Sequence, residues 1–319
     1  RRPPRSTLSS SSAASDVYKR QVYHGAILSQ AELAQLRRIH GIVRLGHVKA
    51  IDADQIHLEQ GSIALDPGTL VVDCTVEGLM HAPELPAILK GGTRVIYISN
   101  EHPEALVRLM PDDATEARVK DHIKRLRATK AMTVSSPAGT NLRISLEGAV
   151  AGGNWGFTTR PGTLTHWPGG IALAFPAAGS VNGTLVLASG DVNLTFKRYV
   201  ESAITLTIEN DYVTAIEGAG LDAQLMRSYI EAWGDREAYS VSHVGYGLCD
   251  AARWDSMALY DKRDFNGTEL RAFAGNFLYS TGANEVAGRY TLGHFDLPMR
   301  HCTVQLDGAT VVDHGRVVD

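Results

Sequence analysis

The chain has 319 residues, of which 44% are hydrophobic and 21% charged, and its formal net charge is -4. These values are typical of a folded globular protein, and the length allows two domains with separate cores. The charge gives no reason to expect nucleic acid as a partner, and no apolar run approaches the roughly 20 residues of a membrane-spanning helix. Three widely spaced cysteines, Cys74, Cys249 and Cys302, favour a reducing compartment. We therefore expect a cytoplasmic, soluble protein that acts on small molecules and forms a homo-oligomer, without nucleic-acid or membrane partners.

The first part of the chain divides into two segments. Residues 1–21 are rich in Arg and Ser and have no apolar core, so they do not predict a secretory signal. We expect them to be an artefactual or disordered leader. Residues 22–79 form the second segment, in which Ser29 and the glutamate three residues later predict the start of a capped helix. Strand-like runs follow at 41–48, 55–58, 62–65 and 69–73, with a hairpin expected at Gln60-Gly61.

Residues 80–136 combine helical and strand patterns. The expected helices cover residues 84–90, 103–110 and 114–130, and a strand is expected at 93–99. Alternation of helices and strands predicts an α/β layer in this segment.

The pattern changes near residues 134–140, where we place a domain boundary. Short strands dominate residues 137–319, with one helix expected at 221–233. The expected strands cover residues 141–146, 171–175, 183–188, 203–209 and 212–217. The predicted fold class is a two-domain α+β or α/β chain, in which an N-terminal α/β layer precedes a β-rich metal-binding domain.

The triplet His294-Phe295-Asp296 is a candidate metal-binding motif. Residues two apart in a strand point to the same face, so His294 and Asp296 could reach one ion while Phe295 faces the other way. Most such pairs in proteins are solvated surface residues. The surrounding apolar strands, with Gly293 before and Pro298 soon after, favour the metal here.

The best third ligand is His243, which is followed by Gly245 and Gly247. Small residues beside an imidazole suit the close approach of a metal or a substrate. A core histidine hydrogen-bonded to backbone, with the glycines serving a turn, explains the pattern equally well. Two histidines and one aspartate would match the facial triad of non-haem iron(II) oxygenases, and zinc with a bound water fits the same set.

Three further residues are candidates for the reaction itself. His166 lies in a Gly- and Pro-rich segment where a general acid or base could face a cleft, and His81 has a similar setting. Ser280 could donate a hydrogen bond to a substrate oxygen. Surface-loop histidines and a turn-forming serine are the simpler alternatives for these residues.

Several segments together resemble one enzyme family, the 2,5-dihydroxypyridine 5,6-dioxygenases, which are distant relatives of the aminopeptidase-T-like metallopeptidases. The segments occur in order from about Met80 to the end of the chain. They are HWPGGIALAFP (166–176), GTLVLASGDVNLTFKRY (183–199), SHVGYGL (242–248), RAFAGNFLYSTGAN (271–284) and GHFDLPMRHC (293–302).

This resemblance implies a cofactor, a site and a reaction. It implies that His243, His294 and Asp296 hold Fe(2+), and that His166, Ser280 and His81 line the substrate pocket. It also implies an Fe(II)-dependent extradiol-type dioxygenase. Such an enzyme uses O2 to open 2,5-dihydroxypyridine to N-formylmaleamate in nicotinate or nicotine degradation.

The chain departs from the family pattern in three places, one of which is its end at Asp319, expected to fall short of the natural C-terminus. Residues 22–79 look more like part of a flavin-dependent oxidoreductase that lacks its glycine fingerprint, so this segment is predicted to be foreign and joined near Leu79-Met80. An acidic residue expected just before the HWP motif is Asn154 here.

Two alternative functions remain open from the sequence. An aminopeptidase-T-like metallo-aminopeptidase would need two metal ions with bridging glutamates. Ile171 and His243 occupy two of those glutamate positions, which disfavours the peptidase because an apolar side chain cannot bind a metal. The other alternative is an inactive metal-binding module.

Overall fold

The computed structural model describes residues 45–46, 48–52, 54–66, 70–73, 85–98 and 101–318. The predicted leader, the helix expected at Ser29, the junction near Leu79-Met80 and His81 lie outside the described residues. Internal contacts divide the chain into residues 1–46 and 47–319. The described helices and strands, from Val48 onward, belong to the second unit.

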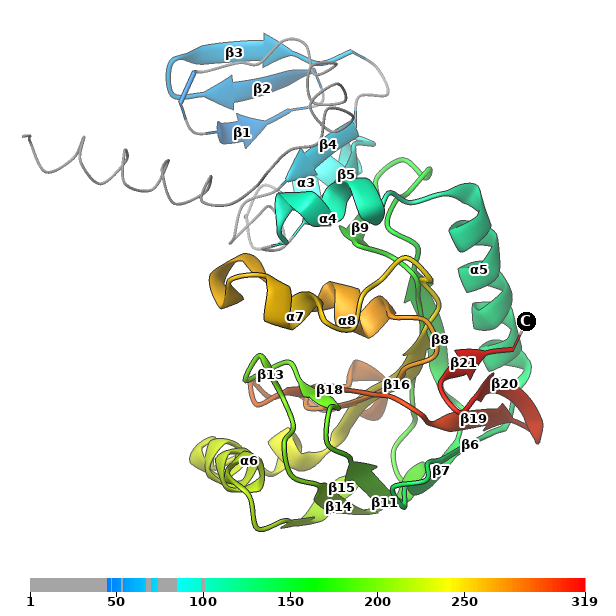
Figure 1. Cartoon of the computed structure of the whole chain (residues 1–319). Coiled ribbons are helices and arrows are strands. Elements are labelled where there is room, and N and C mark those ends of the chain that lie inside the picture. Colours follow the sequence, from blue (N-terminus) through cyan, green and yellow to red (C-terminus); the bar gives the residue numbers. More distant parts are fainter. Residues whose placement is uncertain are drawn as a thin grey trace, which may run out of the picture. The chain divides into compact units, whose positions relative to one another are not determined.

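An antiparallel sheet comes first along the described chain. It consists of β1 (Val48–Ile51), β2 (Gln55–Leu58) and β3 (Gly61–Ala64), drawn in blue in Figure 1. Pairing of Leu58 with Gly61 across the turn confirms the predicted hairpin.

A small parallel sheet follows, as expected for an α/β layer. It consists of β4 (Leu70–Asp73), β5 (Arg94–Ile98) and β9 (Leu164–Trp167), and α3 (Leu85–Lys90) and α4 (Pro103–Arg108) lie in the same part of the sequence. The third strand comes from beyond the predicted boundary at 134–140. The chain therefore returns to this layer after it has entered the β-rich part.

A five-stranded antiparallel sheet occupies the centre of the β-rich part. Its strands, in spatial order, are β18 (Phe295–Met299), β17 (Phe277–Thr281), β16 (Val241–Gly247), β10 (Ile171–Phe175) and β8 (Val150–Asn154). Helix α5 (Asp113–Ala128) lies along β8 and β10 (Figure 1). A Cβ atom on Gly153 of β8 would come within 2.8 Å of Ile123 in α5, so the glycine allows this close approach.

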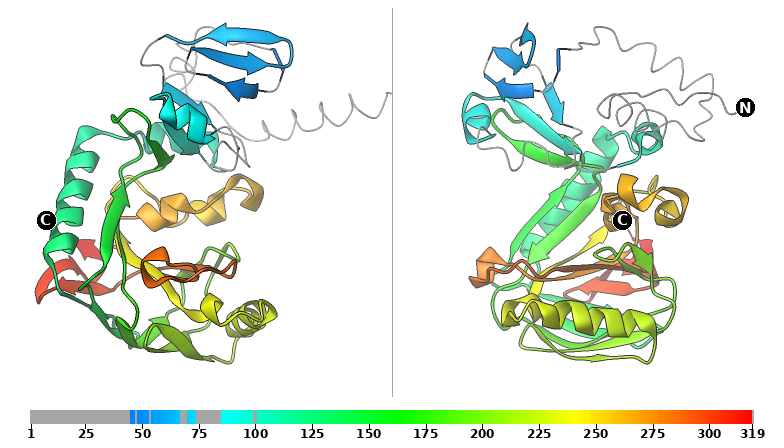
Figure 2. Two further views of the ribbon diagram at one scale, coloured as in Figure 1. Left: turned by 180° about the vertical axis from the view of Figure 1, so that it is seen from behind. Right: turned by 90° about the vertical axis from the view of Figure 1, so that its left-hand side faces the viewer.

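The remaining long strands form an eight-stranded antiparallel sheet. In spatial order they are β15 (Tyr212–Glu217), β14 (Ile204–Glu209), β11 (Val181–Leu187), β7 (Asn141–Ser145), β6 (Ala131–Ser135), β19 (Thr303–Leu306), β20 (Ala309–Asp313) and β21 (Arg316–Val317). Helix α6 (Leu221–Ala232) packs against β15 and is seen along its length in Figure 2. Because β6 and β7 pair over five residues, the predicted boundary at 134–140 falls within one hairpin of this sheet.

Short elements complete the described fold. They are β12 (Val192–Asn193), β13 (Arg198–Tyr199), η2 (Arg236–Tyr239), α7 (Ser256–Leu259), η3 (Lys262–Asp264), α8 (Thr268–Ala272) and η4 (Glu285–Ala287). No helix in the described part of the chain is both long and apolar enough to cross a membrane.

One hydrophobic cluster joins the two large sheets. It contains Leu142, Leu185 and Leu206 from the eight-stranded sheet and Tyr246 and Tyr279 from the five-stranded sheet. Each of these side chains is at most 1% exposed. Shared burial of this kind makes the sheets one mechanical unit, which holds the strands of the candidate site in register.

An ion pair inside this unit supports the loop between β17 and β18. Arg289 of that loop donates to Asp211 at 2.6 Å, and the two side chains are 8% and 0% exposed. Asp211 also accepts a hydrogen bond from the Val181 amide at 2.7 Å. We expect Arg289→Met to lower the free energy of unfolding by about 3–5 kcal/mol, because it leaves a buried carboxylate without its cation.

Urea unfolding followed by circular dichroism measures this effect. The matched control is Arg253→Met, which removes an exposed pair with Asp255 and should leave stability nearly unchanged. Equal stability of the Arg289 and Arg253 variants would refute the structural role of the buried pair.

Candidate metal centre

Strand pairing brings the predicted site residues together. In the register of the five-stranded sheet, His243 of β16 lies opposite Ser280 of β17, and Ser280 lies opposite Asp296 of β18. Side chains directly opposite one another on one sheet face are in contact distance. Three residues far apart in sequence therefore form a row across three neighbouring strands.

His294 joins this row from the residue just before β18. Its Nε2 lies 3.3 Å from Asp296 Oδ2, as the spacing of two residues predicts. Phe295 between them is 1% exposed and packs in the core, so the two neighbours face the opposite side. His294 is 42% exposed and Asp296 only 5%, which places the centre at the edge of the buried sheet.

Hydrogen bonds on the far side of each imidazole select its tautomer. His294 Nδ1 donates to the Thr281 carbonyl at 2.6 Å. The Ser242 hydroxyl donates to the Ala283 carbonyl at 2.6 Å, so it can only accept from His243 Nδ1, 3.1 Å away. Both neutral rings thus direct an Nε2 lone pair toward Asp296, an arrangement typical of metal-binding histidines.

The facing atoms form a cluster of hydrogen-bond acceptors. His243 Nε2 lies 3.7 Å from Asp296 Oδ1, and the Ser280 hydroxyl bridges the two, 3.0 Å from His243 Nε2 and hydrogen-bonded to Asp296. Lone pairs that converge in this way need a proton or a cation between them. Two imidazoles, one carboxylate and a hydroxyl suit a divalent first-row metal ion.

The side chains of the candidate centre are not arranged as a complete set of metal ligands. In the described part of the chain, no three His, Cys, Asp or Glu side chains are arranged to hold an ion as they stand. Ligand atoms on one octahedral ion, at bond lengths near 2.1 Å, lie about 3 Å apart. The separations of 3.3 and 3.7 Å from Asp296 are within 1 Å of that value.

Arg271 of α8 begins one of the family motifs, but the sequence patterns gave it no role at the centre. Its Nε donates to Asp296 Oδ2 at 2.6 Å. Burial by itself would raise the pKa of Asp296, but the Arg271 charge and His294 outweigh it and hold that pKa well below its usual range. Asp296 is therefore an anion at neutral pH, as a ligand must be.

The two histidines titrate differently because their surroundings differ. Burial lowers the pKa of His243 to about 4, so this ring is neutral at physiological pH. Burial also acts to lower the pKa of His294, but its hydrogen bond and attraction to Asp296 outweigh burial and raise it. Protonation is therefore easier at His294 than at His243.

His166 lies in β9, whose partner strand β5 places Tyr97 beside it at a ring separation of 5.3 Å. Burial, with a smaller contribution from the Arg271 charge, lowers the pKa of His166. A neutral imidazole at that position can accept a proton.

Asn154 supports the segment that carries His166. Its side chain donates to the Pro168 carbonyl at 3.1 Å and accepts from the Thr165 hydroxyl at 3.0 Å. Asn154, which occupies the position where an acidic residue was expected, therefore has a structural role: its hydrogen bonds hold this segment in place.

The glycines after His243 serve backbone packing. A Cβ atom on Gly245 would lie 2.2 Å from the Ala172 carbonyl oxygen of β10, and one on Gly247 would lie 2.1 Å from that of Phe273. The prediction that they clear space for a metal or substrate is wrong, because the backbone of neighbouring segments fills that space. Glycine is required at these two positions because the backbone of β10 and of the segment after α8 leaves no space for a Cβ atom.

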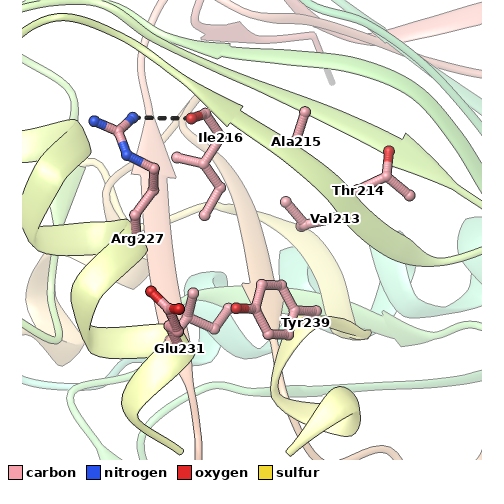
Figure 3. A pocket seen from close by; sticks show the side chains of 8 residues that line it. Val213, Thr214, Ala215, Ile216, Arg227, Glu231 and Tyr239 are labelled. Carbon is pink, nitrogen blue, oxygen red and sulfur yellow. Dashed lines mark hydrogen bonds between the residues drawn. The ribbon is translucent and has the colours of Figure 1, made fainter. Parts of the chain in front are cut away.

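A separate hollow of about 200 Å³ lies between β15 and α6. Figure 3 shows its lining, where Arg227 donates to the Ile216 carbonyl at 2.9 Å beside Glu231 and Tyr239. None of the candidate site residues described here lines it, so this hollow and the candidate metal centre are different places.

Comparison with known proteins decides the family. A model of the 2,5-dihydroxypyridine 5,6-dioxygenase family matches residues 21–319. The 2,5-dihydroxypyridine 5,6-dioxygenase of Pseudomonas putida is 41% identical over 257 residues, which cover 80% of this chain and 72% of that protein. This chain belongs to the 2,5-dihydroxypyridine 5,6-dioxygenase family. The resemblance expected from the motifs is confirmed.

Solved structures agree with the family assignment. The 2,5-dihydroxypyridine dioxygenase from Pseudomonas putida KT2440 superposes with a TM-score of 0.72 at 40% identity, covering 78% of this chain and 71% of that one. Wild-type AmpT from Thermus thermophilus gives a TM-score of 0.51 at 18% identity, covering 74% and 68%. The second likeness shows that this chain shares its fold with AmpT.

Proposed function

We propose that this chain is an iron(II)-dependent 2,5-dihydroxypyridine 5,6-dioxygenase. It breaks the C5–C6 bond of the ring and adds both atoms of dioxygen, which gives N-formylmaleamate. The observation that carries the proposal is the row of His243, Ser280 and Asp296 across β16, β17 and β18, completed by His294. Family membership supplies the substrate class.

The residues of the centre suit ferrous iron. His243, His294 and Asp296 would be its protein ligands, and the Ser280 oxygen stands where it could be a further one. When bound, the iron would supply the redox chemistry by which dioxygen reacts with an electron-rich ring. Thr281 and Ser242 fix the orientation of the two imidazoles toward it.

Other side chains handle protons and charge. His166 is neutral at physiological pH and would accept the proton of the 5-hydroxyl group, which makes the ring more electron-rich. Arg271 keeps Asp296 ionised throughout. The buried strands on one side of the centre exclude water from the ligand atoms, which strengthens each of these electrostatic interactions.

Oxygen uptake by anaerobically iron-loaded protein tests the proposal. With 2,5-dihydroxypyridine we expect one molecule of dioxygen consumed for each ring opened, and with ¹⁸O₂ both labelled atoms in the product. The chelated, iron-free protein should be inactive and should recover on addition of ferrous salt.

Two other results would assign a different function. Iron binding without oxygen uptake would favour a metal-binding module that lacks activity. Peptide hydrolysis by the zinc- or cobalt-loaded protein would favour the chemistry of a metallo-aminopeptidase. Ile171, which is 7% exposed within β10, provides no ligand for the second metal ion that such a peptidase needs.

A further inference from the structure

The guanidinium group of Arg271 is held at two of its three nitrogens. Nε donates to Asp296 at 2.6 Å, and Nη1 donates to Asn266 at 3.0 Å and to the Thr268 hydroxyl at 3.4 Å. Within the described residues, Nη2 has no hydrogen-bond acceptor. The side chain is 25% exposed, so a small molecule beside the centre can reach it.

The acidic side chains near Arg271 do not pair with its Nη2. Burial raises the pKa of Glu101 to about 8, so at neutral pH this carboxyl is mostly uncharged. Glu269 is 0% exposed and is bound by Arg108 through both of its oxygens. Asp296 is the one carboxylate that pairs with Arg271 in the described structure, and it also contacts His294 and Ser280.

The position of the free nitrogen defines what it can bind. Arg271 contacts Asp296 through Nε, so its Nη2 lies close to the candidate metal centre. A planar guanidinium held at Nε and Nη1 presents the Nη2 hydrogens in a fixed direction, which suits an oxygen that carries negative charge. Among the described residues, Asp296 and Asn266 already accept from Nε and Nη1 of Arg271, so an oxygen supplied by a ligand would be the acceptor for Nη2.

We propose that Arg271 binds the second oxygen of the hydroxypyridine, the one on the carbon next to the ring nitrogen. This proposal rests on the proposed function and adds a specificity contact to it. With that oxygen on Nη2, the 5-hydroxyl group would face the histidines and Asp296. The contact would select rings that carry two oxygens on opposite sides over rings that carry one.

A comparison of two ligands isolates the contact. 3-Hydroxypyridine keeps the hydroxyl that corresponds to the 5-position and lacks the second oxygen. Calorimetric titration of anaerobic, iron-loaded wild-type protein should show at least tenfold tighter binding of 2,5-dihydroxypyridine. In Arg271→Gln this preference should fall to about twofold or less, while the affinity for 3-hydroxypyridine changes little.

The controls separate this contact from damage to the centre. Arg253→Gln, which alters an exposed arginine paired with Asp255, should keep the wild-type preference. Iron content is measured in every variant, and Arg271→Lys, which keeps a cation beside Asp296 but lacks the planar fork, replaces the glutamine variant if that one loses iron.

Two outcomes would overturn the proposal. One is an Arg271 variant that keeps the wild-type preference, and the other is an equal loss of affinity for both ligands, which would mean that Arg271 acts only through Asp296. Wild-type protein that binds neither ligand and consumes no dioxygen would instead refute the proposed function.

Discussion

Asp296→Asn is expected to remove iron binding and dioxygen uptake together. The change keeps the size of the side chain but removes the only carboxylate of the ligand set, and it leaves Arg271 beside the centre without its anion. The remaining positive charge would then repel a cation. Substitution of residues that only hydrogen-bond to metal ligands typically lowers metal affinity or activity by about 10–100-fold. Substitution of a ligand itself should therefore lower iron affinity and turnover by at least about a hundredfold.

Metal analysis and an oxygen electrode measure the two effects on one sample. Asp250→Asn is the matched control, because Asp250 is a mostly exposed aspartate whose side chain pairs with Arg118 at 2.8 Å. It should bind iron and turn over like the wild type. Full iron content and activity in the Asp296 variant would show that the ion binds elsewhere.

His166→Ala should lower turnover by about 10²–10⁴-fold while the iron stays bound. This range is typical for removal of a general acid or base. His166 belongs to β9 of the parallel sheet and makes no hydrogen bond to His243, His294 or Asp296 in the described structure. Loss of iron from this variant would reassign His166 to the metal ligands, and unchanged turnover would remove it from the reaction.

The lowered pKa of His166 also predicts how turnover depends on pH. A base must be unprotonated, and burial lowers the pKa of His166 below the usual histidine value. Wild-type turnover should therefore stay constant as the pH falls to the usual histidine range, and should decrease only at lower pH. The acidic decrease due to this group should be absent in His166→Ala. His314→Ala, which changes a histidine 70% exposed at the surface, should keep the wild-type pH profile.

Local patterns predicted many elements of the fold closely. The strands expected at 55–58, 171–175 and 212–217 coincide with β2, β10 and β15. These segments are short, rich in β-branched or apolar residues, and bounded by turn-forming residues, so local signals suffice. By contrast, β17 is buried along its whole length and has no alternation of polar and apolar residues to predict its pairing.

The domain boundary was harder to predict because it depends on pairing. The change in composition near residues 134–140 is real, but it marks a hairpin turn between β6 and β7. The strand β9 pairs with β5, whereas β8 before it and β10 after it pair with each other. The composition of the chain cannot show that one strand, β9, joins a different sheet from the strands on either side of it.

The sequence by itself determined the chemical groups of the centre. A histidine and an aspartate two residues apart in a strand must share a face, so the pairing of His294 with Asp296 follows from local geometry. The motifs around them also determined the family.

Only the tertiary structure decided how the remaining groups meet. His243 and Ser280 are 37 residues apart, and their contact depends on the register of β16 and β17. Arg271 reaches Asp296 from α8, and the motif that begins at Arg271 did not indicate this contact. The physical reason is that register and helix placement are set by burial of the shared core, a sum over distant residues that no short segment contains.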